Sequence, residues 1–516
     1  MRVLIFHGYL LSGTGSNVYN ANLAAALRRA GHEVHLFSQE RHPEQLDFVD
    51  AVGEWHDGRF SVRTLREPVR CTAYRPDIGG LLPVYVPDSY EGIEARPFPE
   101  LSQAEIDRYL DANVEAVREV ADLVAPDLAL ANHLVMGPAV LARALDRSVP
   151  YAAVIHGSAL EYTVKPNPER FVPYAREGIV AGSGVLVGSR HTAESLWDAL
   201  GDPGLPARTR LGPPGVDTEL FAPRPPAEAL AALRALAGAL GQESGEAVAA
   251  GAWGRDPSRA ADALERFAAA EGPRVLFVGK LIVSKGIDLL LAAWPLVAAA
   301  NPGARLLLVG FGEYADAAQE LWRALSSGDQ TAAAAIAAEG RAREGGEEEP
   351  LWMLQAFLDR LPPGYTDAAR AAADGVAFAG RLDHDEVAAV VPACDALVFP
   401  STFPESFGMV AAEAAAAGVL PVSAAHSGLA EVSLELAKAL PSDARDLVSF
   451  ELGEEAVAGI AGRVNGWLAA DAGTREESRR ALRETVERLW SWERVARGVL
   501  AASSGDLDAL PRVPEA

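Results

Sequence analysis

Short apolar runs alternate with segments of helical periodicity along most of the 516-residue chain. Such runs suit strands that are buried on both faces, and most are followed by a loop rich in glycine or polar residues. The clearest helical segment is 101–124, where apolar side chains recur three or four positions apart. Together these elements predict a doubly wound parallel sheet through about residue 205. Its predicted strands are 2–7, 32–37, 127–131, 151–155 and 184–187.

The same alternation resumes at residue 274 and predicts a second domain of this kind. Its predicted strands are 274–278, 305–309, 376–379, 396–399 and 419–422. Ala- and Glu-rich stretches with helical spacing, 223–273 and 313–374, read as inserts, and we treat them as candidates for an acceptor cover or an oligomer interface. The predicted divisions are 1–222, 223–273 as linker, 274–485, and a C-terminal helix 486–510 that returns to the first domain.

Residues 55–100 contain several prolines and show no clear periodicity, so an irregular stretch is expected there. Arginines gather in it although the protein is acidic. A solvated basic face is the simpler interpretation, and a pocket for an anionic acceptor is the functional alternative. The candidate acceptor-binding residues are Arg63, Arg66, Arg70 and Arg75.

The net charge of −25 argues against nucleic acid or an anionic lipid surface as partner. The chain begins with a strand rather than a signal peptide, and no apolar run approaches the ~18 residues that would span a bilayer. Cys71 and Cys394 are far apart in sequence, which fits a reducing compartment. A cytoplasmic protein is therefore expected. Two of the four lysines, Lys280 and Lys285, fall in one short stretch, where they suit phosphate binding.

Two patterns that could suggest metal sites have simpler explanations. His32, His35 and His42 lie on or beside a short strand and are typical of a solvated face. Asp383 is followed three residues later by Glu386 before an apolar helix, which is a capping arrangement rather than a metal-binding pair of aspartates. No metal site is predicted.

The stretch 396–418 combines a strand, a loop and an Ala-rich helix that starts near Gly408 and ends at Gly418. A loop that feeds a helix N-terminus binds anions, because free N–H groups and the positive end of the helix dipole face the ligand. Glu405 and Glu413 bracket this junction, roughly 12 Å apart if the span were helical. Carboxylates accept hydrogen bonds, so they suit the hydroxyl groups of a sugar nucleotide. A buried helix with one solvated glutamate is the alternative.

These motifs, in this order, resemble the retaining glycosyltransferases of family 4, which have the GT-B fold. The resemblance covers most of the chain, and it implies two Rossmann-like α/β domains facing across a cleft, with no cofactor or metal required. The matching segments are Gly13 and Gly15, His156–Gly157, Pro214–Phe221, Gly279–Gly286, Glu405–Glu413 and Trp492–Glu493.

The resemblance also implies roles for individual residues. Glu413 would hold the ribose and Glu405 the transferred sugar, while Lys280 and Lys285 would neutralise the departing diphosphate. The turn at the helix start would receive the diphosphate and sugar, a second loop would border the base, and His156 would touch the sugar. The further donor-binding residues are Gly13, Gly15, Arg381, Leu382, Ser406, Phe407, Gly408 and Met409.

The function expected from this resemblance is transfer of a hexosyl group, with retention, from a nucleotide sugar to a hydroxyl acceptor. A UDP-sugar is favoured, with a GDP-sugar as the alternative, and the acceptor is a small molecule or a glycan- or lipid-linked hydroxyl. Two other functions stay open. One is a related GT-B enzyme such as a sugar-nucleotide epimerase or a phosphorylase, and the other is a non-catalytic sugar-nucleotide-binding protein.

Overall fold

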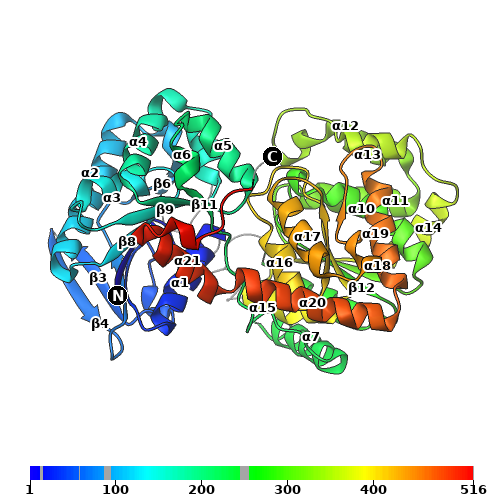
Figure 1. Cartoon of the computed structure of the whole chain (residues 1–516). Helices are drawn as coiled ribbons and strands as arrows, with labels where there is room; N and C mark the ends of the chain where they lie inside the picture. Colours follow the sequence, from blue (N-terminus) through cyan, green and yellow to red (C-terminus); the bar gives the residue numbers. More distant parts are fainter. Residues whose placement is uncertain (12–14, 57, 86–93, 244–254, 515–516) are drawn as a thin grey trace. The chain divides into compact units, whose positions relative to one another are not determined.

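The computed structural model describes residues 1–11, 15–56, 58–85, 94–243 and 255–514 (Figure 1). The chain divides into two compact units. Unit 1 comprises Met1–Gly215 and Trp490–Ala516, and unit 2 comprises Val216–Leu489. Each contains a largely parallel sheet with helices packed on it, so the predicted α/β class with two doubly wound sheets is confirmed.

Within the described residues, the main sheet of unit 1 has nine strands in the order β11-β10-β9-β8-β1-β2-β5-β3-β4. The chain runs outward from β1 in both directions, so the strand order reverses between β1 and β8, where open α/β sheets bind ligands. The pairs are parallel except for the hairpin of β3 and β4. The strands are β1 (Arg2–Phe6), β2 (Glu33–Phe37), β3 (Ala51–His56), β4 (Arg59–Thr64), β5 (Cys71–Arg75), β8 (Leu128–Asn132), β9 (Tyr151–Ile155), β10 (Gly184–Val187) and β11 (Thr209–Leu211).

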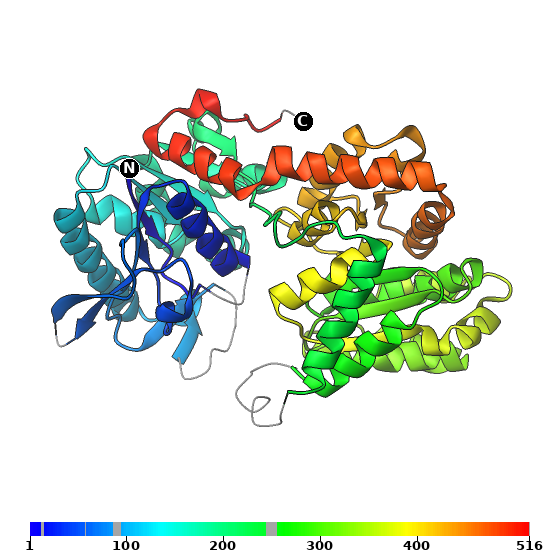
Figure 2. The same ribbon diagram turned by 90° about the horizontal axis from the view of Figure 1, so that it is seen from below.

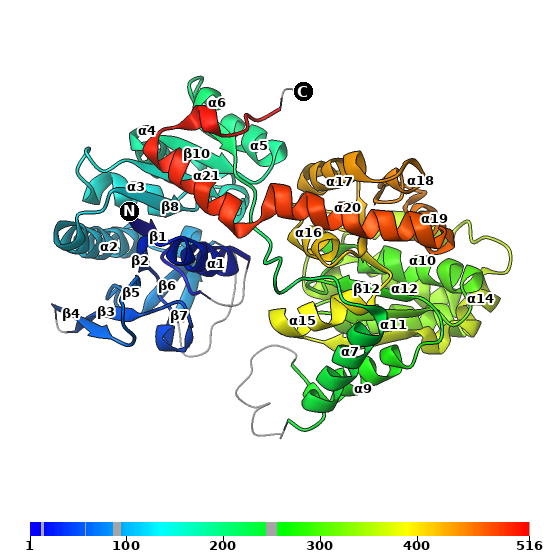
Figure 3. The same cartoon turned by 60° about the horizontal axis from the view of Figure 1, so that its bottom comes forward.

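Alternate side chains of β1 enter two different apolar cores, as the period of a strand requires. Leu4 and Phe6 belong to a core under α2 and α3, while Val3 and Ile5 belong to a core under α1 and α21. The helices α1 and α21 lie side by side although they come from opposite ends of the chain (Figures 1 and 3). The helices of unit 1 are α1 (Gly15–Arg29), α2 (Gln103–Val124), α3 (Gly137–Ala144), α4 (Pro168–Ala181), α5 (Arg190–Leu200), α6 (Leu205–Arg208) and α21 (Trp492–Ser504).

The expectation of an irregular stretch at 55–100 is wrong. β4 and β5 belong to the main sheet, and β6 (Leu81–Val84) pairs with β7 (Glu94–Pro97) in a second, two-stranded sheet. Pro68 and Pro76 flank β5 rather than interrupt it, so they leave its ladder intact. β5 inserts between β2 and β3, and this non-local pairing leaves no signature in the local sequence.

Within the described residues, the sheet of unit 2 has six parallel strands in the order β14-β13-β12-β15-β16-β17, which reverses between β12 and β15. The strands are β12 (Arg274–Val278), β13 (Arg305–Val309), β14 (Val376–Gly380), β15 (Ala396–Phe399), β16 (Leu420–Ala424) and β17 (Ser449–Phe450). The helices are α7 (Pro226–Leu240), α9 (Pro257–Ala268), α10 (Ile287–Ala300), α11 (Ala315–Ser327), α12 (Gln330–Glu339), α13 (Trp352–Leu358), α14 (Tyr365–Ala371), α15 (His384–Val390), α16 (Met409–Ala416), α17 (Ser427–Ala439), α18 (Ser442–Arg445), α19 (Ala456–Ala469) and α20 (Ala472–Trp490).

In its described residues, the first predicted insert forms the helices α7 and α9 of unit 2. α7 and α9 pack against each other, α9 also contacts β13 and β14, and α7 contacts α15 (Figures 2 and 3). The sequence predicted the start of α15 from its cap. Asp383 and Glu386 form a reciprocal capping box there, which confirms capping as the role of these two carboxylates.

Candidate active site

Two loops of unit 2 lie together where β12 and β15 end. One, residues 279–286, leads from β12 to α10, and the other, residues 400–408, leads from β15 to α16. The Thr402 N–H donates to the Ser284 carbonyl at 2.9 Å. Gly286 has φ +65°, and a Cβ there would lie 2.0 Å from the Pro400 carbonyl oxygen. Only glycine therefore permits this approach of the two backbones.

Lys285 and Glu405 form an ion pair between the two loops. The Ser401 hydroxyl donates to the same carboxylate oxygen, Oε1, at 2.8 Å. The Lys285 ammonium also lies 5.3 Å from the ring centroid of Phe399, at the end of β15. Lys280, in the same loop, is exposed, and within the described chain it forms no ion pair. The structure thus places one of the two predicted lysines in direct contact with Glu405.

The turn before α16 is fixed to the start of α17. The Glu405 N–H donates to Ser427 Oγ at 2.9 Å, and the Gly428 N–H donates to the Glu405 carbonyl at 2.9 Å. Gly408, with φ +129°, ends the turn that contains Ser406 and Phe407, and Met409 opens the helix. The first turn of a helix carries N–H groups without partners inside the helix, next to the positive end of its dipole. The Lys285–Glu405 pair therefore lies a few residues from an anion-binding geometry.

Glu413 lies on α16 and is largely buried. Its Oε1 is 2.9 Å from Nε2 of His384, the first residue of α15. Burial acts to lower the pKa of His384, but the hydrogen bond and charge of Glu413, with Asp217 and Asp385 nearby, raise it above its ordinary value. Glu413, the carboxylate that the resemblance assigns to the ribose, is therefore held by a histidine whose pKa is raised.

Arg381 and Leu382 follow β14 and lead into α15. Arg381 stacks over the ring of Phe311, with its guanidinium carbon 5.8 Å from the centroid, and its Nη2 lies 3.4 Å from Asp383 Oδ1. Leu382 is buried. An arginine on an aromatic ring beside a buried leucine can border a planar ring such as a base.

In unit 1, His156 follows β9 and is half-buried. Its Nε2 lies 2.8 Å from Asn132 Oδ1, and Asn20 Nδ2 donates to the same oxygen at 3.1 Å. Burial, together with the charge of His7, lowers the pKa of His156 to about 3. This lowered pKa favours the neutral ring, which can both donate and accept hydrogen bonds. Gly15 opens α1 with open space around it, and Gly13 lies outside the described residues.

Two further histidines, His7 and His133, accompany His156 in unit 1. They follow β1 and β8, and the ring centroid of His133 lies 5.5 Å from that of His7 and 5.0 Å from that of His156. Both ring nitrogens of His133 are buried without a hydrogen-bond partner, and its φ is +68°. An unsatisfied buried group of this kind commonly reflects a function or an unseen water. The polar cluster thus extends along the strand ends on both sides of the point where the strand order reverses.

The four candidate acceptor arginines lie on or near the β3–β4–β5 side of the same sheet. Arg75 pairs with Glu54, and Arg66 donates to the backbone carbonyls of residues 44 and 47. Arg63 and Arg70 are exposed. The strand order puts β5, β3 and β4 beyond β2, away from the strand ends that carry the histidines.

The part of the chain that the structure describes holds neither a metal-binding cluster of side chains nor a helix that could span a membrane. In that part, no cluster of three or more His, Cys, Asp or Glu side chains has an arrangement suited to a metal ion. Among the same residues, no helix has the length and apolar character needed to cross a bilayer.

Family models match both units. The model of "Glycosyltransferase Family 4" matches residues 13–220, and two models of "Glycosyl transferases group 1" match residues 272–335 and 367–440. The first of the two group 1 matches includes the loop that carries Lys285, and the second includes the loop that carries Glu405. Over both units, the chain is therefore similar to the group 1 glycosyltransferases of family 4.

Among curated proteins, this chain is 31% identical to glycogen synthase of Mycobacterium tuberculosis (strain H37Rv) over 249 residues, 47% of this chain and 46% of that protein. The chain thus spans about half the length of the curated relatives it matches. Among solved structures it resembles sucrose-phosphate synthase from Thermosynechococcus elongatus (TM-score 0.56, 20% identity, 98% and 99% of the two chains). It also resembles Anabaena HepE in complex with UDP and glucose (TM-score 0.55, 16% identity, 99% and 100%). These structural likenesses show the shared GT-B fold.

Sequence patterns alone do not identify several neighbours of the candidate residues. Ser401 binds Glu405, His384 binds Glu413, and Asn132 binds His156. A partial signal was present for His7, Asn132 and His133, because each is a polar residue at or just past the end of an apolar strand. His384 lies between Asp383 and Asp385, in the segment whose pattern predicts a helix cap.

Proposed function

We propose that this protein is a retaining glycosyltransferase that moves a hexosyl group from a nucleotide-diphosphate sugar to a hydroxyl acceptor. A UDP-sugar is the favoured donor and a GDP-sugar the alternative. The observation that carries the proposal is the convergence of the Lys285 ammonium, the Glu405 carboxylate and the N-terminus of α16 at the end of β15. A cation beside a helix N-terminus suits a diphosphate, and a carboxylate beside them suits sugar hydroxyls.

In this proposal the residues of unit 2 bind the donor along α16. The N–H groups of Phe407, Gly408 and Met409 receive the diphosphate, with Ser406 in the same turn. Glu405 accepts hydrogen bonds from the hexose and Glu413 from the ribose. Arg381 and Leu382 border the base. Lys280 and Lys285 neutralise the charge that develops on the diphosphate as the anomeric C–O bond breaks, which lowers the barrier because they are already in place.

The chemical step replaces one bond to the anomeric carbon by another. The bond from C1 to the diphosphate oxygen breaks as the acceptor oxygen bonds to C1 on the same face, and the acceptor proton passes to the departing phosphate. The configuration at C1 is therefore retained. His156, neutral and hydrogen-bonded to Asn132, is proposed to contact the hexose, and Gly13 and Gly15 to let backbone approach the phosphates. Arg63, Arg66, Arg70 and Arg75 remain candidates for an anionic acceptor.

No metal is needed in this scheme, because lysine charge and helix N–H groups fulfil its electrostatic role. The protein is proposed to work in the cytoplasm, which suits its two free, buried cysteines, Cys71 and Cys394. The helical inserts are candidates for an acceptor cover or an oligomer interface. The Arabidopsis starch synthase IV structure, which has the same fold, is bound to ADP and acarbose, so ADP-sugars belong in any donor screen.

The test is incubation with UDP-, GDP- and ADP-hexoses, with and without EDTA, while nucleoside diphosphate release is measured. Slow release without acceptor and fast release with a sugar acceptor support a transferase, and NMR of the product gives the anomeric configuration. An inverted product contradicts the retaining mechanism. Nucleotide binding without turnover on any acceptor favours a sugar-nucleotide-binding protein, and a changed hexose that stays on the nucleotide favours an epimerase.

A further inference from the structure

The carboxylate of Glu413 lies in an almost wholly alanine helix and needs a polar partner. The residues around it on α16, Ala411 to Ala416, are buried, and so is the Glu413 side chain. A buried carboxylate is costly unless it is paired or hydrogen-bonded. The structure provides His384, whose Nε2 lies 2.9 Å from Glu413 Oε1. The orientation of this carboxylate therefore depends on a residue from a different helix.

The His384 ring is itself fixed by packing. It lies against Phe221, with ring centroids 5.0 Å apart, and Phe221 is fully buried. Arg483 of α20 donates to the Phe221 carbonyl at 2.9 Å and to the Ala416 carbonyl, at the end of α16, at 3.2 Å. The Arg483 guanidinium thus connects Phe221, against which His384 packs, to α16, the helix that carries Glu413. The distance between His384 and Glu413 is set by packing on both sides.

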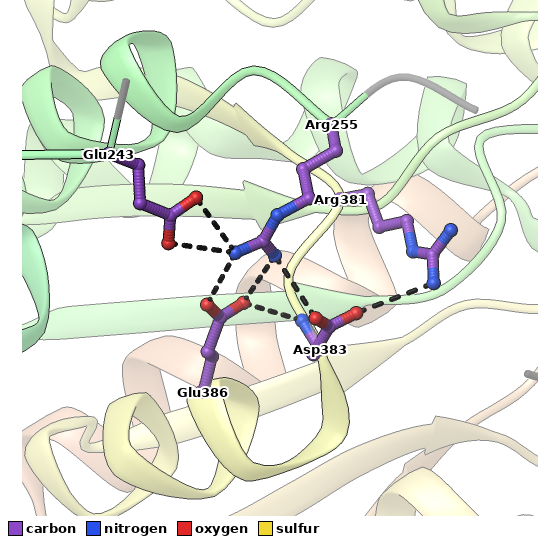
Figure 4. Close-up of polar contacts among 5 residues, drawn as sticks. All are labelled: Glu243, Arg255, Arg381, Asp383 and Glu386. Atoms are coloured by element: carbon purple, nitrogen blue, oxygen red, sulfur yellow. Dashed lines mark hydrogen bonds and ion pairs between the residues drawn. The ribbon is translucent and has the colours of Figure 1, made fainter. Parts of the chain in front are cut away.

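The backbone position of His384 depends on the first turn of α15, and Arg255 holds that turn (Figure 4). Both terminal nitrogens of Arg255 donate to Glu386, each at 2.9 Å, and Nη1 also donates to Asp383 at 3.2 Å. Nη2 donates to Glu243, just after α7, at 3.1 Å. Asp383 and Glu386 are the two members of the capping box whose helix begins at His384. Arg255 therefore joins the helical insert to the start of α15.

The three carboxylates around Arg255 make the capping box of α15 sensitive to the loss of its guanidinium. Without its guanidinium, Glu243, Asp383 and Glu386 would lie close together with much less compensation, and like charges repel strongly where water is partly excluded. The bidentate contact of Arg255 also fixes geometry as well as charge. Its removal is expected to loosen the cap and let His384 move away from Glu413.

We propose that His384 is the positioning residue of Glu413, and that Arg255 of the insert keeps His384 in place through the capping box of α15. This inference rests on the proposed donor site, in which Glu413 binds the ribose hydroxyls. It makes the insert a determinant of donor recognition, because Arg255 acts on Glu413 without touching the ligand. The expected result is selectivity for ribose over 2′-deoxyribose that depends on His384 and on Arg255.

The test compares UDP with 2′-deoxy-UDP, and GDP and ADP with their 2′-deoxy forms, by calorimetric titration of the full chain. For the nucleotide that binds wild-type protein best, the ratio of the two Kd values is expected to fall about tenfold in His384→Phe, which keeps the ring packing but loses the hydrogen bond. His384→Gln, which retains an N–H donor, is expected to restore the ratio to within about threefold. Arg255→Ala is expected to lower it by roughly three- to tenfold. His384→Ala provides a second variant if His384→Phe does not fold.

Two controls change similar contacts elsewhere. His42→Ala removes an exposed histidine beside Glu44, and Arg360→Ala removes an exposed arginine paired with Glu454. Both should keep the wild-type ratio. An unchanged ratio in the folded His384 variants overturns the positioning role while the donor site stands. An unchanged ratio in Arg255→Ala alone overturns the part assigned to the insert. Failure of every nucleotide to bind wild-type protein overturns the proposed function as well.

Discussion

Lys285 and Glu405 lie 120 positions apart in the sequence and form an ion pair beside the N-terminus of α16. In the absence of donor, each partner holds the side chain of the other in position. A diphosphate that enters would compete with Glu405 for the ammonium, and the hexose would take up the carboxylate. In the proposed reaction, the ion pair would hold both groups in place before the donor binds, which would lower the reorganisation that the chemical step requires.

Replacing Lys285 by alanine should lower kcat by ~10²–10³-fold, because the charge that faces the departing diphosphate is lost. Donor KM should change much less if the lysine acts mainly as the phosphate leaves. Steady-state kinetics with the best donor measures both constants. Lys438→Ala is the matched control, because Lys438 pairs with Glu435 on the exposed surface of α17. Wild-type turnover in Lys285→Ala would remove this lysine from the mechanism.

Glu413→Gln should mainly weaken donor binding, by roughly tenfold in KM, with kcat largely retained. The amide keeps the shape of the side chain but replaces one of the two acceptor oxygens of the carboxylate by an NH2 donor. It also removes the charge that pairs with His384. Donor KM and the Kd of the nucleoside diphosphate should rise together. A drop in kcat alone would assign Glu413 to the reacting sugar instead.

Gly286→Ala should both destabilise the protein and impair catalysis. The alanine would adopt φ near +65° and place its Cβ against the Pro400 carbonyl, so the loops bearing Lys285 and Glu405 must separate. Gly345→Ala is the matched control, because Gly345 has φ +81° with no atom within 4 Å of the added Cβ. Both variants should lose roughly 1 kcal/mol or more of unfolding free energy in urea. Only Gly286→Ala should also lose activity, and equal losses in both would mean that the clash is relieved elsewhere.

If the arginines of unit 1 bind an anionic acceptor, their removal should change acceptor KM and leave donor KM alone. Arg63→Ala and Arg70→Ala are the informative variants, because both side chains are exposed, whereas Arg75 pairs with Glu54. The measurement compares a phosphorylated acceptor with its neutral analogue. A changed donor KM would contradict the acceptor assignment.

Local sequence patterns predicted most of the strands, helices and caps whose formation depends on neighbouring residues. Buried strands such as β12 and β15, the helix between Gly408 and Gly418, and the capping box at Asp383 all follow from neighbouring residues. These elements account for the two sheets and for the N-terminus of α16. The insertion of β5 between β2 and β3 depends on residues far away in the chain, so the stretch around it was predicted to be irregular.

The contacts around the candidate site could not be predicted for the same reason. Glu405 and Glu413 were identified by their spacing, but their partners Lys285 and His384 come from other loops and helices. The sequence around Arg255 does not indicate its ion pairs, because the three carboxylates that it contacts lie up to 131 positions away. Sequence spacing relates Glu405 in the loop to Glu413 in the helix that follows, whereas an ion pair between two separate loops depends on how the whole unit packs.

The pair of His384 and Glu413 should make the stability of unit 2 depend on pH. Burial acts to lower the pKa of His384, but the hydrogen bond and charge of Glu413, with the charges of Asp217 and Asp385, raise it above the ordinary value of 6.5. A histidine whose pKa is raised on folding adds stability that is fully present below pH 6.5 and is lost as the pH rises through the folded-state value. The Tm of the wild-type protein should therefore exceed that of His384→Gln most at about pH 5.5, and the difference should shrink towards pH 8.5. A difference that stays constant over this range would mean that His384 holds Glu413 only as a neutral hydrogen-bond donor.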